Sequence, residues 1–454
     1  VMAALRLAGF AERRVNGLAA APNETEGLEA SLRLAREGAA AAPSWLLVVY
    51  GQAREFSQVF AAVDEARASA RPVLDQFDVP ARAAGLRGDM RLPWGGGHAT
   101  RLSIDARWAQ GETNERFRDL GDGFTRLRRA GGAQLIAGLA VEESWTLARG
   151  LILTGGLRLD HWRNVNGIRQ ESDLATGALL VDEKSADQKG WRPSARLGAA
   201  MPLTPALTAR LAAYSAFRVP TLNELHRPFR VRNDITEANP ALRPEKLKGV
   251  EGGLDYAPLA GLEFTATLFA NWLGDAVGNV TLATGPGVFP IAGFVPAGGS
   301  LRQRRNIDGV RVVGLELGGR AEFAGAWALE GSYVYNAARV TAALMAPDLV
   351  GTRLVQVPRH QGQMTLRWQP AGPLSALLRA RAAGRQFDDD LNTRVLKGYG
   401  ALDAALRWQV DAGVTLFANG ENLTDSLIEA ARDGDGLVTR TTPRSLTLGL
   451  RLRL

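Results

Sequence analysis

The 454-residue chain contains no cysteine, only four histidines, and only five lysines among its 54 basic residues. The absence of stray thiols is compatible with a protein that crosses an oxidising envelope compartment. No stretch of about 20 mostly apolar residues occurs, so the sequence predicts no membrane-spanning helix. The nearest candidate, residues 38–50, is too short and contains Pro43.

The residue patterns of common catalytic and metal sites are also missing. We find no Ser-His-Asp set with a nucleophile elbow and no glycine-rich loop that could hold a phosphate. The acidic runs Glu142-Glu143 and Asp388-Asp389-Asp390 have no histidine close by in sequence. We expect them in polar turns or at a rim facing lipopolysaccharide. The sequence therefore predicts no enzyme, no catalytic residue, no metal site and no cofactor.

The formal net charge is +7, and almost all of the positive charge comes from arginine. Nucleotide composition of the genome explains such an excess as well as function does. The functional interpretation is an interior that attracts anionic solutes, or outer loops that pair with anionic lipid headgroups. The arginines are spread along the chain and not gathered in one patch, which argues against nucleic-acid binding.

Strict alternation of apolar with small or charged residues is the main positive signal. It is clearest at the C-terminus, where Leu446, Leu448, Leu450, Leu452 and Leu454 alternate with threonine, glycine and arginine. A period of two places these leucines on one face of a strand. The same rhythm recurs in many segments, and several of them end in tryptophan, as at a membrane–water boundary.

About 18 segments carry this alternation, at residues 1–10, 27–37, 45–62, 84–92, 98–115, 124–144, 146–164, 189–199, 206–218, 246–257, 261–275, 301–323, 326–341, 359–369, 374–387, 398–409, 412–422 and 444–454. Residues 203–205, 258–261 and 409–413 are expected to form tight turns. Long polar or Gly/Pro-rich connections are expected at 165–188, 219–245, 276–300, 342–358 and 423–443. Short turns at one end and long loops at the other are typical of a transmembrane antiparallel β-barrel.

Five motifs, in order along residues 190–454, resemble those of the TonB-dependent outer-membrane receptors. They are the box at residues 217–225 (Phe-Arg-Val-Pro-Thr-Leu-Asn-Glu-Leu), the box at 239–245 (Asn-Pro-Ala-Leu-Arg-Pro-Glu), the segment 309–316, the segment 357–360 and the segment 421–425. The resemblance implies a 22-stranded barrel with short periplasmic turns, long extracellular loops and an N-terminal plug. It further implies uptake of a scarce solute in the outer membrane of a Gram-negative bacterium, with energy delivered by TonB.

The chain departs from this pattern because no plug and no TonB-contacting segment is visible. It begins with a strand-like pattern in place of a signal peptide, so we expect a fragment. Residues 1–454 are expected to be an N-terminally incomplete barrel with about 18 of the 22 strands. Expected partners are the TonB complex, through the absent plug, outer-membrane lipid and lipopolysaccharide, and the cargo; we expect a monomer.

The cargo implied by the resemblance is a ferric siderophore or a related metal chelate. Haem and cobalamin are alternatives within the family, and a passive porin-like channel is the alternative outside it. An outer-membrane barrel enzyme is a third class, but such enzymes are much smaller than this chain.

Candidate ligand-binding residues lie in one predicted extracellular loop: Arg218, His226, Arg227, Arg230 and Arg232. His226 could serve as an axial haem ligand, although no second ligand is evident. Alternatively, His226 simply replaces the aromatic residue that relatives tend to carry at this position. The arginines could receive an anionic chelate or simply face solvent. Arg218 and Glu224 could equally form a charge pair or a turn cap at the strand end.

Further motif residues are expected to shape the structure and not to touch ligand. These residues are Phe217, Pro220, Glu224, Asn239, Pro240, Glu245, Asn422 and Asp425. Proline fixes the backbone of a loop and restricts the residue before it. Short polar side chains such as Asn422 and Asp425 bond to nearby backbone and suit a turn.

Overall fold

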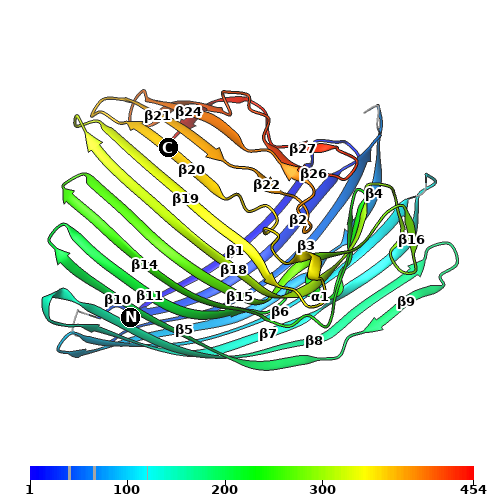
Figure 1. Ribbon diagram of the computed structural model, residues 1–454, viewed down its shortest axis with the longest axis horizontal. Helices are drawn as coiled ribbons and strands as arrows, with labels where there is room; N and C mark the ends of the chain where they lie inside the picture. The colour runs from blue at the N-terminus through cyan, green and yellow to red at the C-terminus, as the bar shows by residue number, and fades with distance from the viewer. Residues whose placement is uncertain (39–41, 65–67, 120, 454) are drawn as a thin grey trace.

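The computed structural model describes residues 1–38, 42–64, 68–119 and 121–453, and it is almost entirely β-structure (Figure 1). Leu454, the last residue of the predicted C-terminal leucine face, lies outside these ranges. The helical elements are α1 (Leu222–His226) and two 3-10 turns, Ala148–Gly150 and Pro347–Leu349. Within the described ranges, none of the helices has the length and apolar character needed to cross a membrane.

The main sheet has 22 strands, eighteen of which form the wall of the barrel. Four of these strands lie in the long connections: β4 (Ala70–Asp78), β9 (Leu179–Lys184), β12 (Phe229–Val231) and β13 (Asp234–Glu237). The other eighteen are β1 (Met2–Val15), β2 (Pro22–Arg36), β3 (Ser44–Val63), β5 (Ala81–Gly95), β6 (His98–Asp119), β7 (Phe124–Thr146), β8 (Ile152–Asp173), β10 (Gln188–Thr204), β11 (Leu207–Arg218), β14 (Glu245–Leu259), β15 (Leu262–Thr284), β18 (Ser300–Phe323), β19 (Trp327–Ala342), β20 (His360–Trp368), β21 (Leu374–Ala383), β24 (Tyr399–Gln409), β25 (Val414–Glu421) and β28 (Ser445–Leu452). Each corresponds to one predicted segment, which confirms the barrel fold.

Alternation divides the wall strands into an outer and an inner face. On β28 the leucines at 446, 448, 450 and 452 are 55–83% exposed, and none of them lies in a protein core. They share a face with Leu416 and Val414 of β25, because register partners in an antiparallel pair project to the same side. Trp327 and Trp368 are partners on this outer face next to the short turns, as expected for a boundary aromatic pair.

The connections alternate between short and long, as the sequence predicted. β10 and β11 are joined through residues 205–206, β14 and β15 through residues 260–261, and β24 and β25 through residues 410–413. The predicted polar loops at 165–188 and 276–300 are partly wrong, because β8 continues to Asp173 and β15 to Thr284. These extensions stay paired, β8 with β9 and β15 with β18, so they satisfy their backbone hydrogen bonds beyond the membrane.

Small hydrophobic cores form among these extensions at the long-loop end. One of them comprises Ala276, Val280, Ile307, Val310, Val340, Ala343 and Leu349. Three small hairpins add to the folded loop region: β16 (Gly287–Phe289) with β17 (Gly293–Val295), β22 (Gln386–Phe387) with β23 (Val395–Leu396), and β26 (Glu429–Arg432) with β27 (Val438–Arg440). The long connections are therefore ordered by packing and pairing and do not behave as open polar loops.

Candidate ligand-binding site

The loop that carries α1 lies against the inner face of the barrel wall. Gln134 of β7 donates from Nε2 to the carbonyl of Pro220 at 3.0 Å. His226, at the end of α1, is 5% exposed, and a Cβ added at Gly167 of β8 would lie 2.3 Å from its Cε1. Glycine at 167 therefore allows the imidazole to pack directly on the strand backbone.

Arg218 and Glu224 form an ion pair at the base of this loop. Glu224 accepts from the Thr221 backbone N–H at 2.7 Å, and Thr221 Oγ1 accepts from the Glu224 N–H at 3.3 Å, which makes a capping box. Arg218 binds Glu224 at 2.8 Å and also contacts Glu245. Burial alone would raise the pKa of Glu224, but Arg218 and the Thr221 N–H outweigh it and lower the pKa.

The other motif residues also lie in the loop framework. Phe217 is the register partner of Lys246, and Glu245 accepts from the Val277 N–H at 2.6 Å. Asn239 donates to the Arg304 carbonyl at 2.9 Å, and the Pro240 carbonyl accepts from Gln188 at 2.8 Å.

Asn422 and Asp425 shape the turn after β25. Asn422 is 2% exposed, and its side chain bonds to both the N–H and the carbonyl of Ser426. Asp425 accepts from the Arg444 N–H at 3.0 Å, which joins this turn to the start of β28. Both residues have a positive φ, a backbone conformation that asparagine and aspartate tolerate better than most.

His226 occupies a position that suits packing better than ligand contact. Its Nδ1 lies 3.4 Å from Ser185 Oγ, and burial lowers the pKa of the imidazole to about 4. A haem iron would need a free imidazole nitrogen facing an open pocket. The buried ring gives the haem alternative no support.

We expect acidification to weaken the attachment of this loop, because the folded pKa of His226 lies below the unfolded value of about 6.5. Above pH 6.5 His226 is neutral in both the attached and the detached loop, so the free energy of attachment does not depend on its titration. Between pH 6.5 and pH 4 only the detached loop binds the proton, and the free energy of attachment falls by about 1.4 kcal/mol per pH unit. Amide hydrogen exchange of residues 222–242 measures this effect. The control is His226→Gln, whose loop lacks the imidazole. The difference between the two proteins in the pH dependence of exchange is the contribution of His226, and identical pH profiles would contradict the prediction.

Arg227 is held by a buried charge network. It donates to Glu115 Oε2 at 2.8 Å, while Arg128 donates to Glu115 Oε1 at 2.6 Å. Glu115 is fully buried, and Arg128 also lies over the ring of Phe117 at 4.0 Å. The guanidinium of Arg227, which the sequence predicted as a ligand contact, is therefore already neutralised by Glu115.

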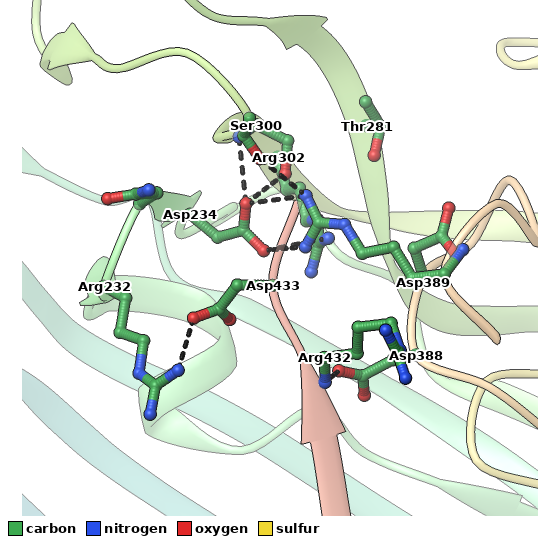
Figure 2. A network of polar contacts seen from close by, with 12 residues as sticks. Arg232, Asp234, Thr281, Ser300, Arg302, Asp388, Asp389, Arg432 and Asp433 are labelled. Carbon is green, nitrogen blue, oxygen red and sulfur yellow. Dashed lines mark hydrogen bonds and ion pairs between the residues drawn. The ribbon is translucent and has the colours of Figure 1, made fainter. Parts of the chain in front are cut away.

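Arg230 and Arg232 are also engaged, and Figure 2 shows the second network, which contains Arg232. Arg232 pairs with Asp433 at 2.6 Å and donates to Thr439 at 3.1 Å. Arg230 donates to the carbonyls of Arg232 and Phe294. Both arginines thus join loops together in place of projecting freely.

Asp234 is the centre of the second network. It accepts from the backbone and side chain of Ser300 at 2.9 and 2.8 Å, and it pairs with Arg302 at 3.0 Å and Arg394 at 2.5 Å (Figure 2). Burial alone would raise the pKa of Asp234, but the two arginines and Ser300 outweigh it and lower the pKa. Three long connections meet at this carboxylate.

The acidic run 388–390 lies in a polar turn, as one of the two predicted placements had it, and ties loops together, whereas Glu142 and Glu143 lie within β7. Asp388 accepts from the Gln356 side chain at 2.7 Å, Asp389 from the backbone of Thr393 and Arg394, and Asp390 from Thr281. No group of three metal-binding side chains occurs in the described part of the chain.

Four arginines at the long-loop end gather without an acidic partner: Arg339, Arg353, Arg359 and Arg385. Arg339 and Arg353 are bridge partners, and they donate to the carbonyls of Gly351 and Val357. Arg353 also lies 5.4 Å from the ring centre of Phe387. In the described part of the chain, none of the four forms an ion pair with a carboxylate.

The electrostatic consequence is a concentrated positive field. Burial, and then the charges of Arg359, Arg385 and Arg339, lower the pKa of Arg353. Arg359 Nε is buried and has no hydrogen-bond partner among the described residues, and the same holds for Asn336 Oδ1. The Asn336 N–H donates to the Arg359 carbonyl at 2.8 Å, so the two orphaned groups belong to neighbouring residues. A buried donor without a partner indicates a ligand or water.

We define Arg353, Arg359 and Arg385 as the arginine cluster, which Arg339 borders, and the sequence did not single it out. A signal was available, because residues 349–387 contain six arginines and no acidic residue. The sequence prediction considered arginines near the family boxes, and of these the structure pairs Arg218, Arg227 and Arg232 with carboxylates.

Comparison with known proteins gives a consistent result. The sequence matches the family described as TonB dependent receptor-like, beta-barrel, over residues 16–423. The iron-regulated outer membrane virulence protein of Vibrio cholerae serotype O1 is 24% identical over 303 residues, which are 65% of this chain and 41% of that protein.

Two solved structures illustrate the similarity in fold. The ferric yersiniabactin uptake receptor FyuA from Yersinia pestis superposes with a TM-score of 0.70 at 16% identity, over 95% of this chain and 61% of that one. The copper transporter OprC gives a TM-score of 0.73 at 18% identity, over 95% and 66%. The chain thus spans about two fifths of the curated relative and less than two thirds of these structures.

Proposed function

Since the chain belongs to the TonB-dependent receptor β-barrel family, we propose that it forms the barrel of a receptor in the outer membrane of a Gram-negative bacterium. Its cargo is a ferric siderophore or a related metal chelate that carries negative charge. The names of the relatives support iron-linked uptake, because one is iron-regulated and another takes up ferric yersiniabactin. The receptor is a monomer and lies among outer-membrane lipid and lipopolysaccharide.

The arginine cluster is the observation that carries the choice of an anionic cargo. Guanidinium groups bind carboxylates and similar oxyanions through paired, charge-assisted hydrogen bonds. A cluster of like charges is unfavourable unless an anion neutralises it, and here the protein supplies none among the described residues. The buried Nε of Arg359 has no hydrogen-bond partner among the described residues, which is consistent with an absent ligand or water beside it.

The sheet edges support a larger barrel. β1 pairs only with β2 and β28 only with β25, and no pairing joins β1 to β28 in the described residues. An unpaired strand edge within lipid is very costly, because its N–H and C=O groups find no water. We therefore propose that further strands close the barrel at these edges, and that a plug in the same protein fills the lumen and contacts TonB.

The test is uptake and binding of ferric chelates by the full-length receptor. Neutralising Arg353, Arg359 and Arg385 to glutamine together is expected to weaken binding of a carboxylate-rich ferric chelate by about 100-fold or more, since each charged hydrogen bond contributes roughly 1.5–3 kcal/mol. A neutral ferric hydroxamate serves as the comparison ligand.

A matched control neutralises Arg13, Arg36 and Arg82, which are exposed wall residues outside the cluster. It changes the net charge equally and should leave chelate affinity unchanged. Equal affinity of the cluster variant and the unmodified receptor for anionic chelates would overturn the proposed function.

A further inference from the structure

A row of three basic residues and one tryptophan crosses four neighbouring strands on the outer face. Lys248 of β14 is the register partner of Trp272 of β15, which is partnered by Arg311 of β18 and then by Arg339 of β19. These strands lie side by side along one flank of the barrel (Figure 1). All four side chains are exposed, and Trp272 retains 46% of its accessible surface.

Every row below this one on the same face is uncharged. The next rows toward the short turns contain Val250, Ala270, Val313 and Ala337; then Gly252, Leu268, Leu315 and Tyr335; then Leu254, Ala266, Leu317 and Tyr333; then Tyr256, Phe264, Gly319 and Gly331. The basic row is therefore the first charged level above a continuous apolar band.

The height of this band matches a membrane. From Leu262 to Ala270 the apolar face of β15 covers about 27 Å along the strand, at about 3.4 Å per residue. A strand tilt of 35–45° reduces this to about 20 Å along the barrel axis, close to the roughly 25 Å apolar band of outer-membrane barrels. The basic row thus lies at the upper boundary of the hydrocarbon, on the long-loop side.

Two cations of the row have no protein partner. Lys248 and Arg311 form no ion pair in the described part of the chain, whereas Arg339 donates to the Gly351 carbonyl. Lys246, one level above, pairs with Asp275 at 2.8 Å. Further along the same face Lys189 and Arg163 are register partners, and Arg163 pairs with Asp187.

Lysine is concentrated on this flank, although arginine is not, since the exposed Arg82 of β5 also lies on the outer face. Three of the five lysines in the chain, Lys189, Lys246 and Lys248, project from the outer face here. On the opposite part of the sheet, at the same long-loop end, Glu26 of β2 and Glu55 of β3 are register partners on the outer face.

We propose that Lys248 and Arg311, with Trp272 between them, bind the phosphate groups of a phosphorylated glycolipid in the outer leaflet. Lysine and arginine form charge-assisted hydrogen bonds with phosphate oxygens. Tryptophan favours the interface between hydrocarbon and headgroups, where a sugar ring would lie. The two cations are two strands apart, about 10 Å, which suits a headgroup with two phosphates. The inference depends on the proposed outer-membrane location and not on the cargo.

The experiment uses the full-length receptor extracted from outer membranes and exchanged into mixed lipid. Native mass spectrometry measures retention of a bisphosphorylated lipid A probe relative to its dephosphorylated form. The double variant Lys248→Gln/Arg311→Gln is expected to lose about 30-fold in retention, from roughly fivefold per surface charge. The conservative variant Lys248→Arg/Arg311→Lys should retain the probe.

The control Arg82→Gln/Lys184→Gln changes the net charge equally but alters residues outside the row, and should retain the probe. Equal retention by the row variant and this control overturns the proposal. Equal retention of phosphatidylglycerol, or of the dephosphorylated probe, by the unmodified receptor also overturns it. The dephosphorylation comparison needs no variant and so remains decisive if a variant folds poorly. Probe retention in a receptor that takes up no chelate would support this inference while refuting the proposed function.

Discussion

Replacing Glu115 with alanine is expected to lower the free energy of unfolding of the α1 loop by about 3–5 kcal/mol. The carboxylate is fully buried between Arg128 and Arg227, whose side chains are 8% and 16% exposed. Removing one partner of a buried ion pair leaves the other charges desolvated and uncompensated. Hydrogen exchange of residues 222–242, together with thermal unfolding in detergent, measures the loss.

Glu112→Ala is the matched control, because Glu112 pairs with Arg129 at 2.8 Å where the arginine is 52% exposed. Exposed pairs of this kind contribute about 0–1 kcal/mol. Similar destabilisation by the two alanine variants would show that the Glu115 network does not hold the loop.

Replacing Asp234 with alanine is expected to release three long connections from one another, at a cost of about 3 kcal/mol. The carboxylate receives Ser300, Arg302 and Arg394, and its side chain is 14% exposed. Without it both guanidinium groups remain largely buried with reduced compensation. Protection of amides in residues 229–237 and 300–302 should decrease together.

Asp187→Ala is the comparison, since its pair with Arg163 is about half exposed on both sides. A double-mutant cycle of Asp234→Ala with Arg394→Ala should give a coupling energy well above 0.5 kcal/mol. Additive effects would mean that the two residues stabilise their loops independently.

The arginines of the loop region fall into two groups, those paired with carboxylates in the two networks and those of the arginine cluster. Arg227 and Arg232 neutralise carboxylates that hold the loops in place. Arg353 and Arg359 have no carboxylate partner in the part of the chain that the structure describes, although they lie in the same region. Electrostatic compensation therefore separates the arginines that organise the loops from those that we propose bind an anionic cargo.

The wall of the barrel could be predicted from short stretches of sequence. The leucines at 446–452 have a period of two, and a strand with lipid on one side must show that period locally. The same reasoning located all eighteen wall strands and the tight turns between them. It misjudged β8 and β15 beyond the membrane, because strand extensions that pair with loop segments need not keep an apolar face.

The sequence by itself determined the fold class, the faces of the wall strands and the end at which the long loops lie, because these depend on residues two apart. Only the tertiary structure decided which charges are compensated, since Arg227 meets Glu115 across 112 residues and Arg394 meets Asp234 across 160. It also aligned Lys248 with Arg311, because that row depends on the register of three strands. Charge pairing over such separations is set by the three-dimensional arrangement of strands and loops, which a local sequence period cannot encode.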